Sequence, residues 1–143
     1  MNKVVIDASV AMKWTFPEIN EQLTSEAVDL LQKYVFGALR IIVPDIFWAE
    51  VGNVLWKGVR RERWSRDAAR IAATATRSRA FPTVSSSELL HDALEIAINH
   101  DRSVYDSLYL ALAVQANCDL ITADERLANA VAAYLPVKWL GAV

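Results

Sequence analysis

Four carboxylates stand in apolar surroundings where an acidic side chain is unexpected. They are Asp7, Glu50, Asp106 and Asp124. If the fold brings them together, they repel one another and raise each other's pKa. A hard divalent cation such as Mg²⁺ or Mn²⁺ relieves that repulsion, because these ions prefer oxygen ligands. Such an ion can activate water and polarise a phosphoryl oxygen, so the chemistry to consider is the hydrolysis of a phosphate ester.

Two of the acids follow short apolar runs that are typical of buried strands. Asp7 follows Val4–Ile6, and Asp124 comes two residues after Leu120–Thr122. In an open parallel sheet, ligands bind beyond the carboxyl ends of the strands. Each residue could instead cap only the turn or helix that follows it.

The other two acids lie within helical patterns. Glu50 has apolar residues four positions before and after it, and Asp106 is the only charged residue from 103 to 117. Burial of a lone carboxylate is costly, so these positions indicate a function. The alternatives are that Glu50 reaches past its neighbours into solvent, and that Ser103 and Asp106 form a capping box.

Short apolar runs alternate with helical patterns along the chain, which has 143 residues and is 54% hydrophobic. We predict strands at 3–7, 40–43, 83–84, 120–121 and 137–140, and helices at 20–36, 44–56, 65–78, 87–99, 103–117 and 124–134. This alternation is typical of an α/β fold whose parallel sheet is covered on both faces. The length favours one domain over residues 1–143. Such a topology can bring the four acids to one edge of the sheet.

Other chemistries find little support in the sequence. The glycines form neither a dinucleotide-binding motif nor a P-loop, and no G-x-S-x-G elbow is present. His91 and His100 have no evident catalytic setting, and Cys118 is the single cysteine. This cysteine content suits a reducing cytoplasm. The N-terminus lacks the features of a signal peptide, and no apolar run is long enough to span a membrane.

Basic residues gather in one segment, 57–79. It holds eight basic against two acidic residues, while the rest of the chain holds seven against fifteen. Trp56 and Trp64 lie beside these cations, and such a mixture suits an RNA backbone and its bases. The alternative is a solvated helix face.

Four motifs follow one another at a specific spacing: VIDASV (5–10), PDIFWAEVGNVL (44–55), YDSLYLALA (105–113) and LITADERL (120–127). In this order they resemble the motifs of PIN domains, specifically the VapC-type toxin ribonucleases of bacterial and archaeal toxin–antitoxin pairs. The resemblance covers nearly the whole chain. It implies a three-layer α/β/α sandwich with a mostly parallel sheet of about five short strands.

The resemblance also implies a metal-dependent endoribonuclease. Asp7 and Asp106 would be the most direct ligands of Mg²⁺ or Mn²⁺, and Glu50 and Asp124 would bind directly or through water. Residues that would contact these ligands or the phosphate are Ser9, Asn53 and Thr122. The implied partners are RNA, a second copy of the chain in a homodimer, and a VapB-type antitoxin whose tail covers the site.

Two other classes of protein share parts of this pattern. An aspartyl-phosphate phosphatase or phosphotransferase would use Asp7 as a nucleophile, but that class places a second aspartate two residues on, where this chain has Ser9. A non-catalytic signalling or binding domain of α/β fold could also bind Mg²⁺ at strand ends. A receiver-type domain would need an acidic pair after the first strand, and Asp7 stands alone there.

Overall fold

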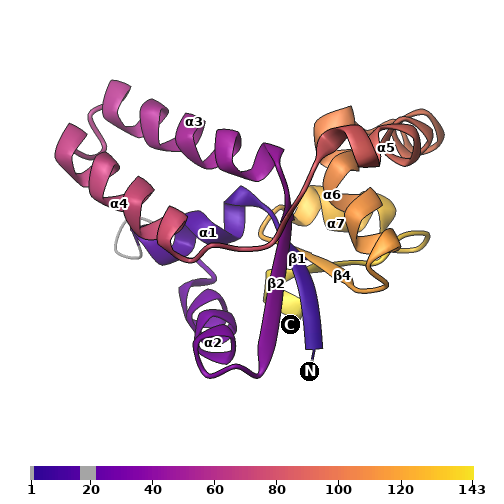
Figure 1. The fold of residues 1–143 in the computed structure, drawn as a ribbon, viewed down its shortest axis with the longest axis horizontal. Helices are drawn as coiled ribbons and strands as arrows, with labels where there is room; N and C mark the ends of the chain where they lie inside the picture. Colours follow the sequence, from indigo (N-terminus) through magenta and orange to yellow (C-terminus); the bar gives the residue numbers. More distant parts are fainter. Residues whose placement is uncertain (1, 17–21) are drawn as a thin grey trace.

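In the part of the chain that the structure describes, five parallel strands form one sheet in the order β3-β2-β1-β4-β5. The computed structural model describes residues 2–16 and 22–143 (Figure 1). The strands are β1 (Asn2–Ile6), β2 (Leu39–Pro44), β3 (Thr83–Val84), β4 (Asp119–Thr122) and β5 (Val137–Trp139). The helices are α1 (Ala8–Thr15), α2 (Thr24–Val35), α3 (Ile46–Arg60), α4 (Arg66–Ser78), α5 (Ser86–His100), α6 (Val104–Gln115) and α7 (Glu125–Val131), and a 3₁₀ turn spans Leu140–Ala142.

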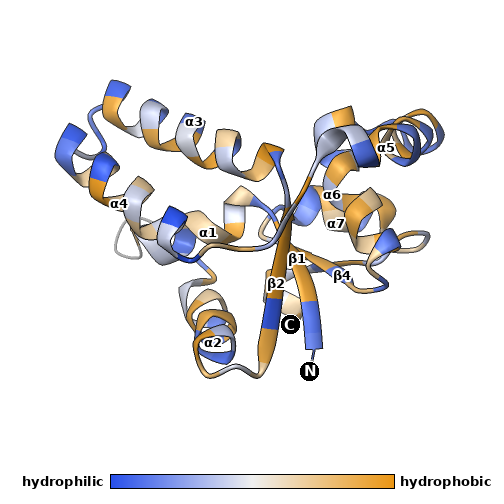
Figure 2. Ribbon diagram, viewed as in Figure 1, coloured by the Kyte–Doolittle hydropathy of each residue, from blue (hydrophilic) through white to orange (hydrophobic). Residues whose placement is uncertain are grey.

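Helices cover both faces of the sheet. Figure 1 shows α1 to α4 on one side of the strands and α5 to α7 on the other. The central strands are therefore apolar along most of their length, as the colouring of β1 and β2 in Figure 2 shows. Among the described residues, no helix has the length and apolar character needed to cross a membrane.

The strand order reverses at β1, and this reversal creates a crevice. Successive strands run from β1 to β2 and β3 on one side, whereas β4 and β5 lie on the other. Ligands of doubly wound sheets bind at such a switch point, beyond the carboxyl ends of the strands. Because Ile6 pairs with Ile121, the next residues of the two strands, Asp7 and Thr122, come side by side.

The predicted α/β fold with a parallel sheet is confirmed, and each predicted strand is present to within two residues at either end. The helix predicted from 44 continues to Arg60, and the one predicted to reach 134 ends at Val131. The helix predicted from 87 begins at Ser86, because Ser85 occupies the N-cap and its Oγ accepts from Glu88 N at 3.3 Å. The helix predicted from residue 20 begins at Thr24, and residues 20 and 21 lie outside the described ranges.

Helix α1 was not predicted. Most of its residues are small or apolar, and Ala8, Val10, Ala11 and Met12 are all buried, so no polar face marks it in the sequence. Asp7 supplies its N-cap by accepting a hydrogen bond from Ser9 N at 3.1 Å. Asp45, which was predicted to help open α3, makes no capping bond there. Its carboxylate accepts instead from Ser86 N at 2.9 Å and joins the end of β2 to the start of α5.

Trp64 closes the turn between α3 and α4. Its indole Nε1 donates to Leu55 O at 3.0 Å, and its ring stacks on Phe16 with centroids 4.3 Å apart. The ring lies so close to Gly58 that a Cβ there would be 1.9 Å from Trp64 Cζ2. Any larger residue at this position would therefore require Trp64 to move.

A pair of glycine substitutions on α3 tests this packing. Gly58→Ala is expected to lower the free energy of unfolding by about 1–3 kcal/mol, because Trp64 must move. Gly52→Ala is expected to raise it by about 0.5–1 kcal/mol, since alanine is the better helix former and a Cβ there meets nothing within 4 Å. Urea unfolding monitored by circular dichroism measures both. Equal effects from the two substitutions would contradict the assignment.

Candidate active site

The four predicted acids line a single hollow of about 620 Å³. Asp7 enters it from the end of β1, Glu50 from the first half of α3, Asp106 from the first turn of α6, and Asp124 from the N-cap of α7. These elements meet beyond the carboxyl ends of β1 and β4, at the switch point of the sheet. Residues that are 117 positions apart in the chain thus face one cavity.

Both oxygens of Asp7 are held by hydroxyl groups. Thr122 Oγ1 donates to Oδ2 at 2.5 Å, and Ser9 Oγ donates to Oδ1. Each hydroxyl also accepts a backbone N–H from the turn before α7: Ser9 Oγ from Ala123 at 3.0 Å, and Thr122 Oγ1 from Asp124 at 3.0 Å. Ser9 and Thr122 therefore orient Asp7 and place the turn that carries Asp124.

Burial raises the pKa of Asp7 from 3.8 to about 6. The hydrogen bonds from Ser9 and Thr122 oppose this effect, and the charge of Glu50 adds to it. A bound cation would lower this pKa and stabilise the ionised carboxylate, because a nearby positive charge favours ionisation.

Glu50 is held by the buried Tyr109. The Tyr109 hydroxyl donates to Glu50 Oε1 at 2.6 Å, and the tyrosine side chain is 3% exposed. Burial raises the pKa of Glu50, the bond from Tyr109 lowers it, and the charge of Asp106 raises it again. The pKa of Tyr109 is itself raised, first by burial and then by Glu50, so this hydroxyl keeps its proton and remains a donor.

Asp106 and Asp124 complete the acidic wall. Burial raises the pKa of Asp106, and the charge of Asp124 adds to this effect, whereas Arg102 and Ser103 lower it. Ser103 Oγ accepts from Asp106 N at 3.1 Å, so the predicted cap of α6 is present. Asp124 caps α7 by accepting from Leu127 N at 3.2 Å. Capping uses one oxygen of Asp124 and leaves the other for the hollow.

Around the hollow, the charge of one acid raises the pKa of the next. Glu50 raises the pKa of Asp7, Asp106 that of Glu50, and Asp124 that of Asp106. Within residues 2–16 and 22–143, no three Asp, Glu, His or Cys side chains form a ready-made cation site. The carboxylates thus line an open cleft and do not form a closed cage. An open, oxygen-lined cleft suits Mg²⁺, which is usually held by one or two carboxylates and keeps several waters.

Several residues that line the hollow were not predicted from the sequence as part of the site, among them Tyr109 and Lys57. Both carried a usable signal, because residues three or four apart share a helix face. Tyr109 follows Asp106 by three residues, and Lys57 follows Asn53 by four. Asn53, predicted as a contact, does line the hollow.

Replacement of Tyr109 tests its role as a positioning residue. Tyr109→Phe removes only the hydroxyl that holds Glu50, so Mn²⁺ affinity is expected to fall about 10-fold, within the range for residues that orient metal ligands. Titration of the metal-free protein followed by electron paramagnetic resonance measures this directly. Tyr34→Phe is the matched control, because the Tyr34 hydroxyl also donates one partly buried hydrogen bond, to Arg79 O at 2.9 Å, away from the hollow. Unchanged Mn²⁺ affinity in Tyr109→Phe would contradict the assignment.

The tryptophans of α1 and α3 differ in their burial. Trp14 donates to Ala27 O at 2.7 Å and Trp48 to Thr83 Oγ1 at 3.0 Å, and both rings pack against the core. Trp56 is 53% exposed. Trp64, considered above as part of a basic and aromatic surface, is instead packed in the α3–α4 turn.

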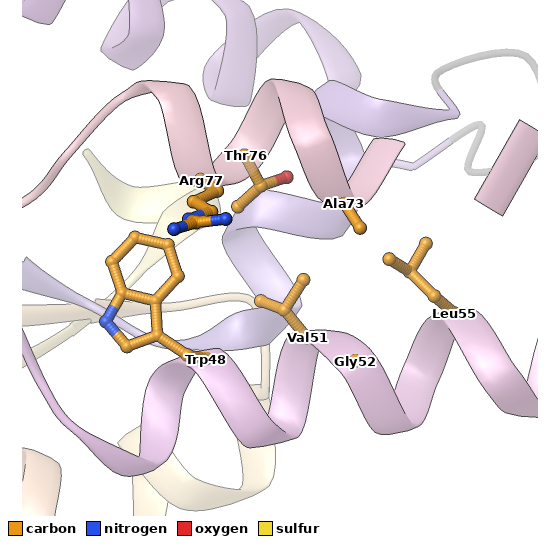
Figure 3. A pocket seen from close by; sticks show the side chains of 7 residues that line it. All are labelled: Trp48, Val51, Gly52, Leu55, Ala73, Thr76 and Arg77. Atoms are coloured by element: carbon orange, nitrogen blue, oxygen red, sulfur yellow. The ribbon is translucent and has the colours of Figure 1, made fainter. Parts of the chain in front are cut away.

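A second hollow lies between α3 and α4 and has a volume of about 440 Å³. Figure 3 shows the side chains that line it, Trp48, Val51, Gly52 and Leu55 from α3 and Ala73, Thr76 and Arg77 from α4. Its lining is mainly apolar and contains no carboxylate. Of these two hollows, only the acidic one is lined by carboxylates that could hold a divalent cation.

Comparison with known proteins agrees with this architecture. Residues 4–132 match the PIN domain family. The chain is 32% identical to Ribonuclease VapC3 of Pyrobaculum aerophilum over 129 residues, which cover 89% of this chain and 93% of that protein. It is 30% identical to Ribonuclease VapC9 of Mycobacterium tuberculosis over 134 residues, which cover 94% and 95% of the two chains.

The fold comparison extends to a solved structure. The crystal structure of PAE2754 from Pyrobaculum aerophilum superposes with a TM-score of 0.66, covering 99% of this chain and 85% of that one at 18% identity. At this identity the match supports the fold alone. The family match and the two relatives go further: this chain belongs to the PIN domain family, and within it to the VapC type.

Proposed function

We propose that this protein is a metal-dependent endoribonuclease, the toxin of a type II toxin–antitoxin pair. The observation that carries the proposal is the convergence of four acids from distant parts of the chain on one hollow. Two relatives that align over nearly their full length and carry the name ribonuclease support it. In this proposal residues 1–143 act as one PIN domain.

The cation would be Mg²⁺ or Mn²⁺, held by Asp7 and Asp106 directly and by Glu50 and Asp124 directly or through water. When bound, it supplies a positive charge that polarises the phosphate and makes water more acidic. The chain's own side chains orient these ligands: Ser9 and Thr122 hold Asp7, and Tyr109 holds Glu50. Asn53, which lines the hollow, would donate to a phosphate oxygen.

The proposal includes partners of the kind found for the toxins that this chain resembles. A VapB-type antitoxin would cover the acidic hollow, two copies of the chain would form a homodimer, and the pair would act in the cytoplasm. The apolar face of α5 is a place to look for the dimer contact, because Leu90, Leu94 and Ile98 are 44–66% exposed on it.

Two features support hydrolysis of RNA over an aspartyl-phosphate mechanism. Ser9 stands two residues after Asp7, where an aspartyl-phosphate enzyme places a second aspartate, and its hydroxyl donates to Asp7. Glu50 lies on a helix, away from the strand-end positions that a receiver-type domain uses. Trapping of an acyl phosphate on Asp7 would favour the rival mechanism.

Cleavage of labelled RNA by the purified protein tests the proposal. We expect no cleavage in EDTA, recovery on addition of Mg²⁺ or Mn²⁺, and a loss of about 100-fold or more in Asp106→Asn. Asp67→Asn is the matched control, because Asp67 lies on α4 with its side chain 87% exposed. Cleavage that persists without divalent cations, or an Asp106→Asn protein with full activity, would refute the proposed mechanism.

A further inference from the structure

We propose that the second half of α3 is a track for single-stranded RNA, which leads from the acidic hollow along Lys57, Arg60 and Arg61 with Trp56 beside them. The inference rests on the proposed function, and it assigns the path that the substrate takes to the site.

The first argument is the face of α3 on which these residues lie. Glu50, Asn53 and Lys57 line the acidic hollow at intervals of three and four residues. Arg60 is the last residue of α3 and Arg61 is its C-cap. They follow Lys57 by three and four residues, so they continue the same face. With a rise of about 1.5 Å per residue, Lys57 lies about 10 Å and Arg61 about 16 Å beyond Glu50 along the helix axis. Figure 1 shows α3 running outward from the end of β2, so this face leads away from the acids.

The second argument is that these cations are available. Lys57, Arg60 and Arg61 are exposed, and none of them forms an ion pair in the described part of the chain. Other arginines of segment 57–79 have contacts elsewhere. Arg63 lies over Trp64, Arg70 pairs with Asp67, Arg77 lines the α3–α4 hollow, and Arg79 lies over Trp14.

The third argument is the aromatic group on the track. Trp56 is 53% exposed, and the Arg60 guanidinium lies 5.4 Å from its ring centroid. Unpaired RNA bases stack on aromatic rings and on arginine planes. Base faces in a duplex are covered by their neighbours, so a tryptophan beside a row of cations favours a single strand.

The charge distribution explains why the substrate would need cations beside the acidic hollow. The acidic hollow repels phosphates, so the strand needs attraction nearby for one phosphate to enter it. Cations on the adjoining turns of α3 supply that attraction for the neighbouring phosphates, while the reacting phosphate lies beside Asn53 and the acids.

The test measures RNA binding in a cleavage-deficient Asp106→Asn protein. The probe is a fluorescein-labelled oligouridine of about 12 nucleotides, within the range that one binding groove covers. Combined Lys57→Ala, Arg60→Ala and Arg61→Ala should weaken binding about 30-fold near 0.1 M salt. The slope of log K against log salt should fall by about 2, because each lost contact to single-stranded nucleic acid removes about 0.7. Trp56→Ala should weaken binding about 5-fold, within the range for loss of one stacked base, with the slope unchanged.

A second triple variant is the matched control. Arg66→Ala, Arg70→Ala and Arg77→Ala together remove the same charge from α4, and binding should change less than 3-fold, as expected for cations outside the track. Equal losses in the two triple variants would overturn the track, as would an α3 triple variant that binds normally. In either case cleavage by the unmodified protein would still support the proposed function, so the two failures are distinguishable. Displacement of the RNA by poly-L-glutamate at equal charge concentration would assign the surface to an acidic protein and would also overturn the track.

Discussion

Asp7→Asn is expected to abolish RNA cleavage and at the same time to stabilise the metal-free protein. Cleavage is lost because asparagine removes the charge that the proposed cation needs. Stability rises because the native carboxylate is buried beside Glu50 and has its pKa raised from 3.8 to about 6. That increase corresponds to a penalty of about 3 kcal/mol for holding the charge at neutral pH.

The net gain is smaller than this penalty. Asparagine keeps the N-cap of α1, but its amide nitrogen cannot accept the proton that Thr122 now donates to Asp7. That loss costs about 1 kcal/mol. We therefore expect a gain of about 1–2 kcal/mol in the free energy of unfolding at pH 7.5, measured by urea unfolding in EDTA.

The gain should depend on pH in a defined direction. Between pH 3.8 and about 6 the folded protein retains a proton on Asp7 that the unfolded chain has released. The free energy of unfolding therefore falls as the pH rises through this window, and the penalty is complete above it. The advantage of Asp7→Asn should be largest above pH 6 and should shrink toward pH 4.

A second aspartate provides the comparison. Asp119→Asn removes a charge from β4 that forms an ion pair with Lys138 at 3.3 Å, outside the acidic hollow. It should not stabilise the protein, and cleavage should be retained. If Asp7→Asn were less stable than the native chain at pH 7.5, the burial of a charged carboxylate at this position would be disproved.

Thr122→Val is expected to lower both the stability of the protein and its cleavage of RNA. Thr122 is completely buried, and its hydroxyl joins Asp7 Oδ2 to the backbone N–H of Asp124. Valine preserves the shape but leaves both partners without this bond, at a cost of about 2–4 kcal/mol in stability. Cleavage should fall about 10- to 100-fold, because two proposed ligands lose their orientation.

The pH profile separates this role from a general loss of stability. The bond from Thr122 lowers the pKa of Asp7, so its removal raises that pKa. Because the proposed mechanism needs the charge of Asp7, the increase of cleavage with pH should then occur at higher pH. Thr76→Val is the control, because Thr76 is 8% exposed and its hydroxyl donates only to Ala72 O of its own helix, at 2.8 Å. It should cost less than about 1 kcal/mol and leave the profile unchanged. Superimposable profiles for Thr122→Val and the native chain would argue against a link through Asp7.

Much of this protein could be read from local patterns. Among residues 2–16 and 22–143, periodicity located each strand and six of the seven helices, because each of those elements buries a recognisable set of apolar residues. It missed α1, whose residues are small or apolar on several sides, so that no contrast marks its faces. The acids stood out because each is a charged residue close to apolar residues in the sequence.

The tertiary structure decided which group bonds to which acid. The motifs indicated Ser9 and Thr122 as contacts of the ligands or the phosphate, but the order of residues does not show that Thr122 donates to Asp7 across 115 positions, or that Tyr109 holds Glu50 across 59. These contacts depend on the register between β1 and β4 and on the placement of α3 and α6, which both line the hollow. Both are set by the packing of side chains distant in sequence, and hydrogen bonds of this kind leave no periodic signal along the chain.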